Sequence, residues 1–151
     1  MTLINKSTDN LLNTLQNTSP SELKNYFQEH FKEGEPTFSG YIDQLLFQKK
    51  LKRQDVLIKA NLPQKYGYKL LTGETHTTDR DKILRICFSM EMSLKETQRA
   101  LRLYGLSELY PKQKRDVCLI VALGQKMFDI DQVNDMLIAE GEAPLYDPMT
   151  E

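Results

Sequence analysis

Apolar residues recur at helical spacing along most of this chain, and turn-forming residues interrupt them. Between Leu51 and Gly73 the helical pattern stops at Asn61-Leu62-Pro63 and then resumes. Asn61 tolerates the left-handed conformation that ends a helix, Pro63 can open the next helix, and Gly73 suits the position just past its end. The pattern predicts two short helices joined by a tight turn, which is the outline of a helix-turn-helix.

The first 36 residues predict two shorter helices. Thr8 or Asp9 can cap the first, and Ser19-Pro20-Ser21-Glu22 is a start signal for a second helix that runs through Phe31. The second helix carries an apolar stripe, so we expect it to pack against the core or against a partner. Gly34-Glu35-Pro36 then breaks the chain and marks a domain boundary.

Two later segments align with each other, 80–110 with 115–146. Arg80-Asp81 matches Arg115-Asp116, and each segment reads as a helix, a turn, a capped helix, a glycine stop and a Leu-Tyr tail. Ser93 and Glu96 form a capping box at the second helix of the first segment. A single helical hairpin cannot bury its own apolar face, so we expect the two hairpins to stack.

These patterns predict an all-α protein with three parts. Residues 1–36 form a helical N-terminal extension, 37–110 a helix-turn-helix domain, and 111–151 a C-terminal helical hairpin packed on it with an acidic end. The sequence has 151 residues, 40% of them hydrophobic and 27% charged, which suits a soluble globular chain. No apolar run approaches the roughly 20 residues of a membrane span, and no secretion leader is present, so we expect a cytoplasmic protein.

Candidate chemistry is sparse. Cys87 and Cys118 lie within apolar helical runs, which predicts buried free thiols rather than a disulfide or a metal site. The two histidines, His30 and His76, stand in unrelated contexts, and no nucleophile-elbow, phosphate-loop or zinc-protease motif is present. We therefore expect no enzyme activity, no cofactor and no metal.

Positive charge is concentrated on the helix-turn-helix element. From Lys49 to Lys69, seven basic residues stand against one acid, Asp55, which gives +6 in a chain whose net charge is −1. Such a concentration of positive charge is typical of a surface that contacts phosphate. The alternative interpretation is that these lysines simply lie on solvated helix faces. The chain from Phe128 to Glu151 has seven acids and no bases, which is either a solvated face or a segment that weakens binding by folding onto the basic helices.

The segment from Tyr41 to Leu101 resembles the phage-repressor class of helix-turn-helix domains (Cro/C1, xenobiotic-response-element type) of bacteria and phages. The corresponding helices would be 41–49, 53–61 and 63–71, with Thr72-Gly73 at the stop. The chain departs from that pattern at three positions. Leu57 replaces a small residue, Asn61 replaces the turn glycine, and Gly67 stands where a branched apolar side chain is usual.

The resemblance implies a transcriptional regulator that binds double-stranded DNA in a sequence-specific way, commonly as a homodimer. It places base-reading residues at the start of the third helix and phosphate-gripping residues at the start of the second. The implied DNA-binding residues are Lys52, Arg53, Gln64, Lys65, Tyr66, Tyr68 and Lys69. The dimer surface would be the stripe around Tyr26, Phe27 and Phe31 or the final hairpin.

Three alternatives stay open. Tyr66 and Tyr68 can instead pack in the core around the side chain that Gly67 lacks. The whole element can keep its shape in a protein-interaction adaptor without nucleic acid, whose partner would bind the N-terminal or C-terminal helices. A helical RNA-binding protein would prefer single strands stacked on tyrosines.

Overall fold

Every described element of the chain is a helix. The computed structural model describes residues 8–30 and 36–146, and no strand forms within those ranges. The predicted all-α class is therefore confirmed for the described part of the chain. None of the helices described there combines the length and the apolar character needed to cross a bilayer. The chain divides into two compact units, Met1–Glu35 and Pro36–Glu151.

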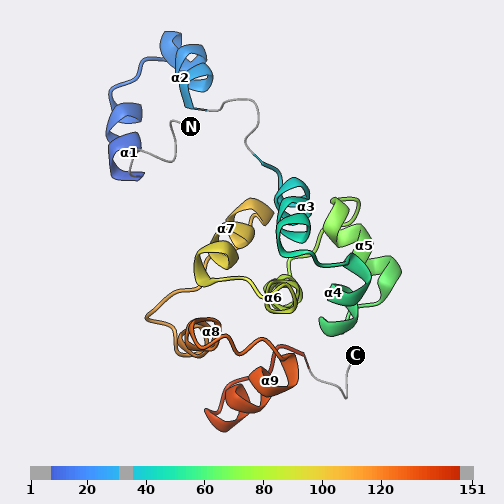
Figure 1. The fold of residues 1–151 in the computed structure, drawn as a ribbon. Helices are drawn as coiled ribbons and strands as arrows, with labels where there is room; N and C mark the ends of the chain where they lie inside the picture. Colours follow the sequence, from blue (N-terminus) through green and yellow to red (C-terminus); the bar gives the residue numbers. More distant parts are fainter. Residues whose placement is uncertain (1–7, 31–35, 147–151) are drawn as a thin grey trace. The chain divides into compact units, whose positions relative to one another are not determined.

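The first unit holds two α-helices joined through a short 3-10 helix (Figure 1). Their bounds are α1 Thr8–Gln16, η2 Pro20–Glu22 and α2 Leu23–His30. At the predicted start signal, the Ser19 hydroxyl donates to the Glu22 carboxylate at 2.7 Å. Tyr26 is buried within this unit, whereas Leu12, Leu15, Leu23 and Phe27 are exposed. Phe31 and the Gly34-Glu35 break lie outside the described residues.

The described part of the second unit contains seven α-helices. Their bounds are α3 Phe38–Lys49, α4 Arg53–Lys59, α5 Gln64–Thr72, α6 Arg80–Ser89, α7 Leu94–Tyr104, α8 Lys114–Gly124 and α9 Ile130–Ala139. Loops of up to nine residues join consecutive helices.

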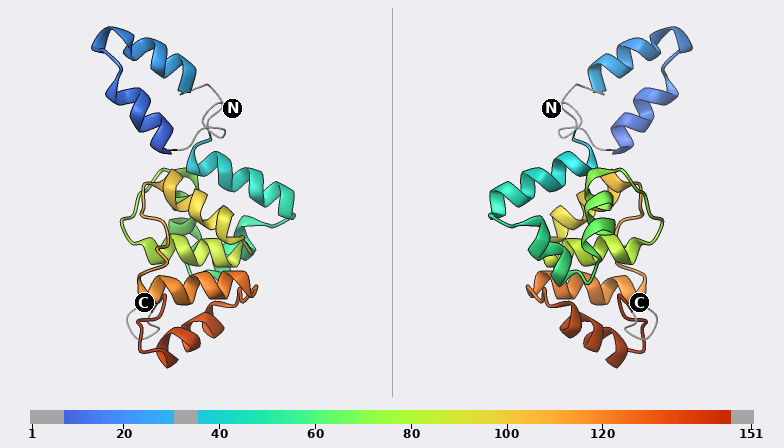
Figure 2. Two further views of the ribbon diagram at one scale, coloured as in Figure 1. Left: turned by 90° about the vertical axis from the view of Figure 1, so that its left-hand side faces the viewer. Right: turned by 90° about the vertical axis from the view of Figure 1, so that its right-hand side faces the viewer.

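Helix α6 is the centre of the second unit. All seven of its residues from Ile83 to Ser89 are buried, as expected of a core helix that neighbours surround. In Figure 1, α3, α4, α5 and α7 are arranged around α6, and Figure 2 shows α8 and α9 on the side of α6 away from α3. The one cation in this run, Arg85, donates to the carbonyls of Ala60 at 2.9 Å and Leu145 at 3.1 Å. Arg85 therefore ties the end of α4 to the C-terminal tail.

The same helix-ending turn recurs four times in the second unit. A non-glycine residue takes a positive φ of 55° to 58°, and the apolar residue after it donates its amide to a carbonyl five positions back. The four left-handed residues are Lys50, Asn61, Glu91 and Lys126, followed by Leu51, Leu62, Met92 and Met127. Asn61 was expected in this conformation, and the other three were not.

The two aligned segments make equivalent contacts. Arg80 of the first segment pairs with Asp116 of the second, with nitrogen–oxygen distances of 2.5 and 3.2 Å. In return, Arg115 pairs with Asp81 at 2.8 and 3.0 Å. The matched Arg-Asp dipeptides thus cross-link the starts of α6 and α8 reciprocally, and this arrangement is called the Arg-Asp clasp below.

The same equivalence extends to the tails of the two segments. The amide of Leu109 donates to the Gln98 side chain at 2.7 Å, and the amide of Leu145 donates to the Asn134 side chain at 2.7 Å. Both acceptors lie in the second helix of their hairpin, so each Leu-Tyr tail is held against its own helix by one side-chain amide.

Several predicted boundaries shift. Helix α3 begins at Phe38 rather than Tyr41, because the Thr37 hydroxyl caps it by accepting from the Gly40 amide at 3.0 Å. Helix α4 ends at Lys59, and Pro63 precedes α5 rather than opening it. Both cysteines are free thiols, but only Cys87 is buried, and that burial raises its pKa to about 12.

Candidate nucleic-acid interface

Helices α4 and α5 form a small two-helix element on the side of α6. Their inward faces are apolar: Val56 and Leu57 are buried from α4, and Leu70 and Leu71 from α5. Their outward faces carry part of the predicted cluster of positive charge. Because α6 supports the inner face, the outer face is fixed by a rigid core rather than by a loop.

Two of the three departures from the repressor pattern lie against each other. A Cβ atom placed on Gly67 would come 2.5 Å from Leu57 Cδ2, far inside van der Waals contact. The large side chain at Leu57 therefore occupies the space that a branched residue at position 67 would fill. The larger side chain at position 57 thus compensates for the missing side chain at position 67, and α4 and α5 stay closely packed.

Most of the predicted base-reading residues are exposed at the start of α5. Gln64, Lys65 and Tyr68 are exposed, and the Gln64 amide donates to the Gln54 carbonyl at 3.1 Å. The buried positions 67, 70 and 71 mark the inward face of α5, position 65 lies opposite that face, and the exposed positions 64 and 68 lie at its margin. Lys69, one turn after Lys65, is half-buried.

Arg53 is held beside this face by two groups. Its guanidinium donates to the Asp43 carboxylate at 2.8 Å and lies 5.4 Å from the centre of the Tyr68 ring. The hydrogen bond with Asp43 is the main cause that raises the pKa of Arg53. Lys52, the residue before α4, is exposed. Arg53 therefore orients Tyr68 and contributes charge that Asp43 partly offsets.

Tyr66 turns toward the core instead of outward. It is half-buried, and Lys82 of α6 donates to its hydroxyl at 3.3 Å while lying 4.9 Å from the ring centre. The core-packing alternative for Tyr66 therefore describes its surroundings better than base reading does. Lys82 is a cation near α5 that the sequence did not indicate, because sixteen positions separate it from Tyr66.

The start of α5 differs from the start of each other described helix in the second unit. Pro63 makes no side-chain cap, and no acid occurs in the first turn of α5. Helix α3 is capped by Thr37, α4 has Asp55 in its first turn, and α6 to α9 each have a capping side chain and an acid there. Uncapped first-turn amides and the positive end of the helix dipole favour an anion.

Part of the predicted charge cluster faces elsewhere. Lys49 pairs with Glu96 at 3.1 Å and donates to the Glu91 carbonyl at 3.2 Å, so it is directed toward α7. Lys59 lines a pocket against α9. The exposed cations that remain around α5 are Lys50, Lys52 and Lys65, together with the half-buried Lys69.

No group of three or more His, Cys, Asp or Glu side chains gathers as a metal site within residues 8–30 and 36–146. No family model, curated protein or solved structure matches this chain. The resemblance to the repressor class therefore rests on the motif residues alone.

Proposed function

We propose that this protein binds double-stranded DNA sequence-specifically, as a transcriptional regulator, and that α5 enters the major groove. The observation that carries the proposal is the start of α5, where uncapped amides, no acid and the exposed side chains of Gln64 and Lys65 share one surface. This combination suits a phosphate at the helix end and a base edge beside it.

Each side chain has a role in this proposal. Gln64 can pair with adenine and Lys65 with guanine in the major groove. Tyr68, which packs against Arg53, can touch a thymine methyl group or a phosphate. Lys52 lies at the start of α4, where it can contact the DNA backbone. Tyr66, engaged with Lys82, positions α5 on the core.

A homodimer on a two-fold site is part of the proposal, because helix-turn-helix regulators commonly read two half-sites about one helical turn apart. The exposed apolar side chains of the first unit, Leu12, Leu15, Leu23 and Phe27, are one candidate dimer surface. The last hairpin, where Val117, Val121 and Ile138 are exposed, is the other. Selection of binding sites from random duplexes would show symmetric half-sites.

The first test is a salt titration of binding to a generic duplex, measured by fluorescence anisotropy. The paired variant Lys52→Gln with Lys65→Gln should reduce the slope of log affinity against log salt by about 2, roughly one per lost phosphate contact. Both side chains are exposed, so the helix content should not change.

A matched control is Lys95→Gln with Lys112→Gln, which removes the same charge from exposed positions on α7 and the loop after it. This control should leave the salt slope unchanged. Equal losses from both variants would mean that net charge alone attracts the duplex, and the groove assignment would be wrong.

The second candidate function is a protein-interaction adaptor. The observation that favours it is Phe47 at the end of α3, which is 86% exposed although it is a large aromatic side chain. Exposed aromatic residues are common on protein contact surfaces. The adaptor predicts no measurable complex with duplex DNA even at low salt, which separates it from the regulator in the titration above.

A further inference from the structure

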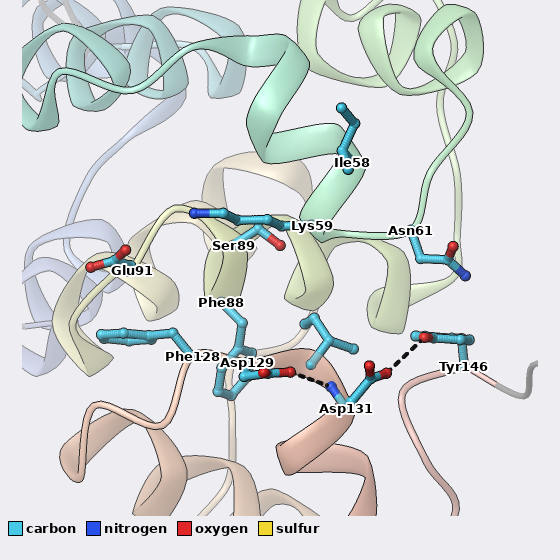
Figure 3. Close-up of a pocket in the computed structure, with 11 residues that line it drawn as sticks. Ile58, Lys59, Asn61, Phe88, Ser89, Glu91, Phe128, Asp129, Asp131 and Tyr146 are labelled. Carbon is cyan, nitrogen blue, oxygen red and sulfur yellow. Dashed lines mark hydrogen bonds between the residues drawn. The ribbon is translucent and has the colours of Figure 1, made fainter.

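A second site lies on the other side of α4. A pocket of about 570 Å³ opens between the end of α4, the end of α6 and the start of α9 (Figure 3). Its volume falls in the range of about 300 to 1,000 Å³ that is usual for small-molecule sites. The pocket lies entirely within the second unit, and none of its lining residues belongs to the proposed DNA-binding set around α5.

One buried polar group lines this pocket without a partner. Ser89 is 3% exposed, and its hydroxyl forms no hydrogen bond within the described part of the chain. A buried hydroxyl without a partner is unfavourable, and alanine would fill the same space without that cost. The hydroxyl can both donate and accept, so it can serve a polar group on a bound molecule.

The lining around Ser89 combines acids with aromatic rings. Asp129 and Asp131 begin α9, and Glu91 lies at the turn after α6, against a single ammonium from Lys59. Phe128 and Tyr146 supply ring surfaces. Three carboxylates against one cation favour a positively charged molecule, and the rings favour one with an apolar body.

The two acids of α9 are fixed in place. Asp129 accepts from the Asp131 amide at 2.9 Å, and Asp131 accepts from the Tyr146 hydroxyl at 3.0 Å (Figure 3). Each carboxylate uses one oxygen in these bonds, and its second oxygen accepts none within the described residues. These second oxygens are suitable acceptors for an ammonium group.

We propose that this pocket binds a small organic amine with an aromatic body. The ammonium lies at Asp131 and Asp129, the ring packs on Phe128, and a polar group on the ring meets the Ser89 hydroxyl. This site is separate from the proposed DNA-binding face and does not depend on it, so either proposal can fail without the other.

The test uses the full-length protein and three probes followed by amide chemical shifts. The probes are tyramine, phenethylamine, which lacks the hydroxyl, and 4-hydroxyphenylpropionate, which replaces the amine by a carboxylate. The two amines should shift the amides of Ser89, Asp131 and Tyr146, with tyramine about threefold tighter through its hydroxyl. The carboxylate probe should bind at least about tenfold more weakly.

Two variants assign the contacts. Asp131→Asn should weaken both amines about fivefold, whereas Asp135→Asn, which removes the same charge from an exposed position of α9, should not. Ser89→Ala should raise the melting temperature and make the two amines bind equally.

The proposal is overturned by any of four results: the anion binds as tightly as the amines, neither amine shifts the pocket amides, Asp131→Asn has no effect, or Ser89→Ala lowers the melting temperature. The last result would show that the Ser89 hydroxyl already has a structural partner.

Discussion

The α4–α5 pair and the α6–α7 and α8–α9 pairs share one turn but differ in how their second helix starts. In all three pairs a left-handed residue is followed by a buried or half-buried apolar residue. Helices α7 and α9 then begin on a side-chain cap with an acid in the first turn, and α5 begins on Pro63 with neither. The shared turn fixes the path of the backbone between the two helices. The cap and the first-turn residues that follow determine whether the start of the second helix carries negative charge.

The pairs also differ in how they are joined to the core. The α6–α7 and α8–α9 pairs are linked by the Arg-Asp clasp, which combines the buried Asp116 carboxylate with three partly exposed charged groups. Helices α4 and α5 pack through apolar contacts and the compensated Leu57–Gly67 pair, and two cations of α6 donate to uncharged acceptors on this element, the Ala60 carbonyl and the Tyr66 hydroxyl. Lys52 and Lys65 therefore stay on the surface. The α4–α5 pair therefore carries exposed cations, whereas the α6–α7 and α8–α9 pairs neutralise the charges of their Arg-Asp dipeptides in ion pairs.

The largest expected effect is on the clasp. Asp116→Ala should lower the free energy of unfolding by about 3 kcal/mol, because it leaves Arg80 without its carboxylate next to the core. The Asp116 side chain is 4% exposed and also accepts from the Tyr110 amide at 2.9 Å. Asp81→Ala, at a carboxylate that is 27% exposed, should cost only about 1 kcal/mol.

Urea unfolding of both variants checks this order. Asp135→Ala is the matched control, because that acid lies on the exposed face of α9, and it should change the free energy of unfolding by less than about 0.5 kcal/mol. Equal losses at positions 81 and 116 would show that burial does not distinguish the two halves of the clasp.

The sequence predicts the parts of this fold that depend on local chemistry. The Ser93–Glu96 capping box and the glycine stops at Gly73 and Gly105 occur as expected, because each depends on one turn of backbone. The alignment of the two Arg-Asp dipeptides can be read from the sequence, but their reciprocal pairing cannot. Which arginine meets which carboxylate depends on how two hairpins stack, and spacing along one chain does not encode that.

In the candidate site, too, some features follow from the local sequence and others depend on neighbouring helices. The exposure of Lys65 follows from helical periodicity, whereas Gln64 is exposed because it is the first residue of α5. The turn of Tyr66 toward Lys82 depends on a neighbouring helix, and so does the direction of Lys49 toward Glu96. The fit of Leu57 over Gly67 could have been suggested by reading the two departures as a pair, since one residue gains the volume that the other lacks.

A smaller effect is expected when the start of α5 is made like that of α9. Pro63→Asp introduces a cap and a carboxylate at the end of α5, and the affinity for duplex DNA should fall about tenfold by repulsion from phosphate. The cap stabilises α5 by about 1 kcal/mol and the lost proline rigidity offsets it, so the unfolding free energy should change little.

Pro63→Asn is the control for this change, because it supplies a neutral cap of the same shape. Its DNA affinity, measured by anisotropy at the same salt concentration, should fall less than about threefold. A loss as large as that of Pro63→Asp would assign the effect to the helix start itself rather than to charge.

The smallest expected effect concerns the acid at the start of α7. Burial acts to raise the pKa of Glu96, but the hydrogen bonds from Ser93 and the ion pair with Lys49 outweigh it and lower that pKa below its ordinary value of 4.5. A carboxyl group with a lowered folded pKa stabilises the protein above the ordinary pKa, and this contribution is lost as the pH falls through the folded value.

Glu96→Gln keeps an acceptor for the capping box and removes only the charge. The variant should be less stable than the natural chain by up to about 1 kcal/mol at neutral pH. The difference should shrink toward zero as the pH falls through the lowered folded pKa of Glu96, because the natural side chain then becomes protonated. Denaturant unfolding at several pH values measures this, with Glu91→Gln, at an exposed acid in the preceding turn, as the control. A difference that stays constant with pH would mean that the shape of the side chain, and not its charge, holds the start of α7.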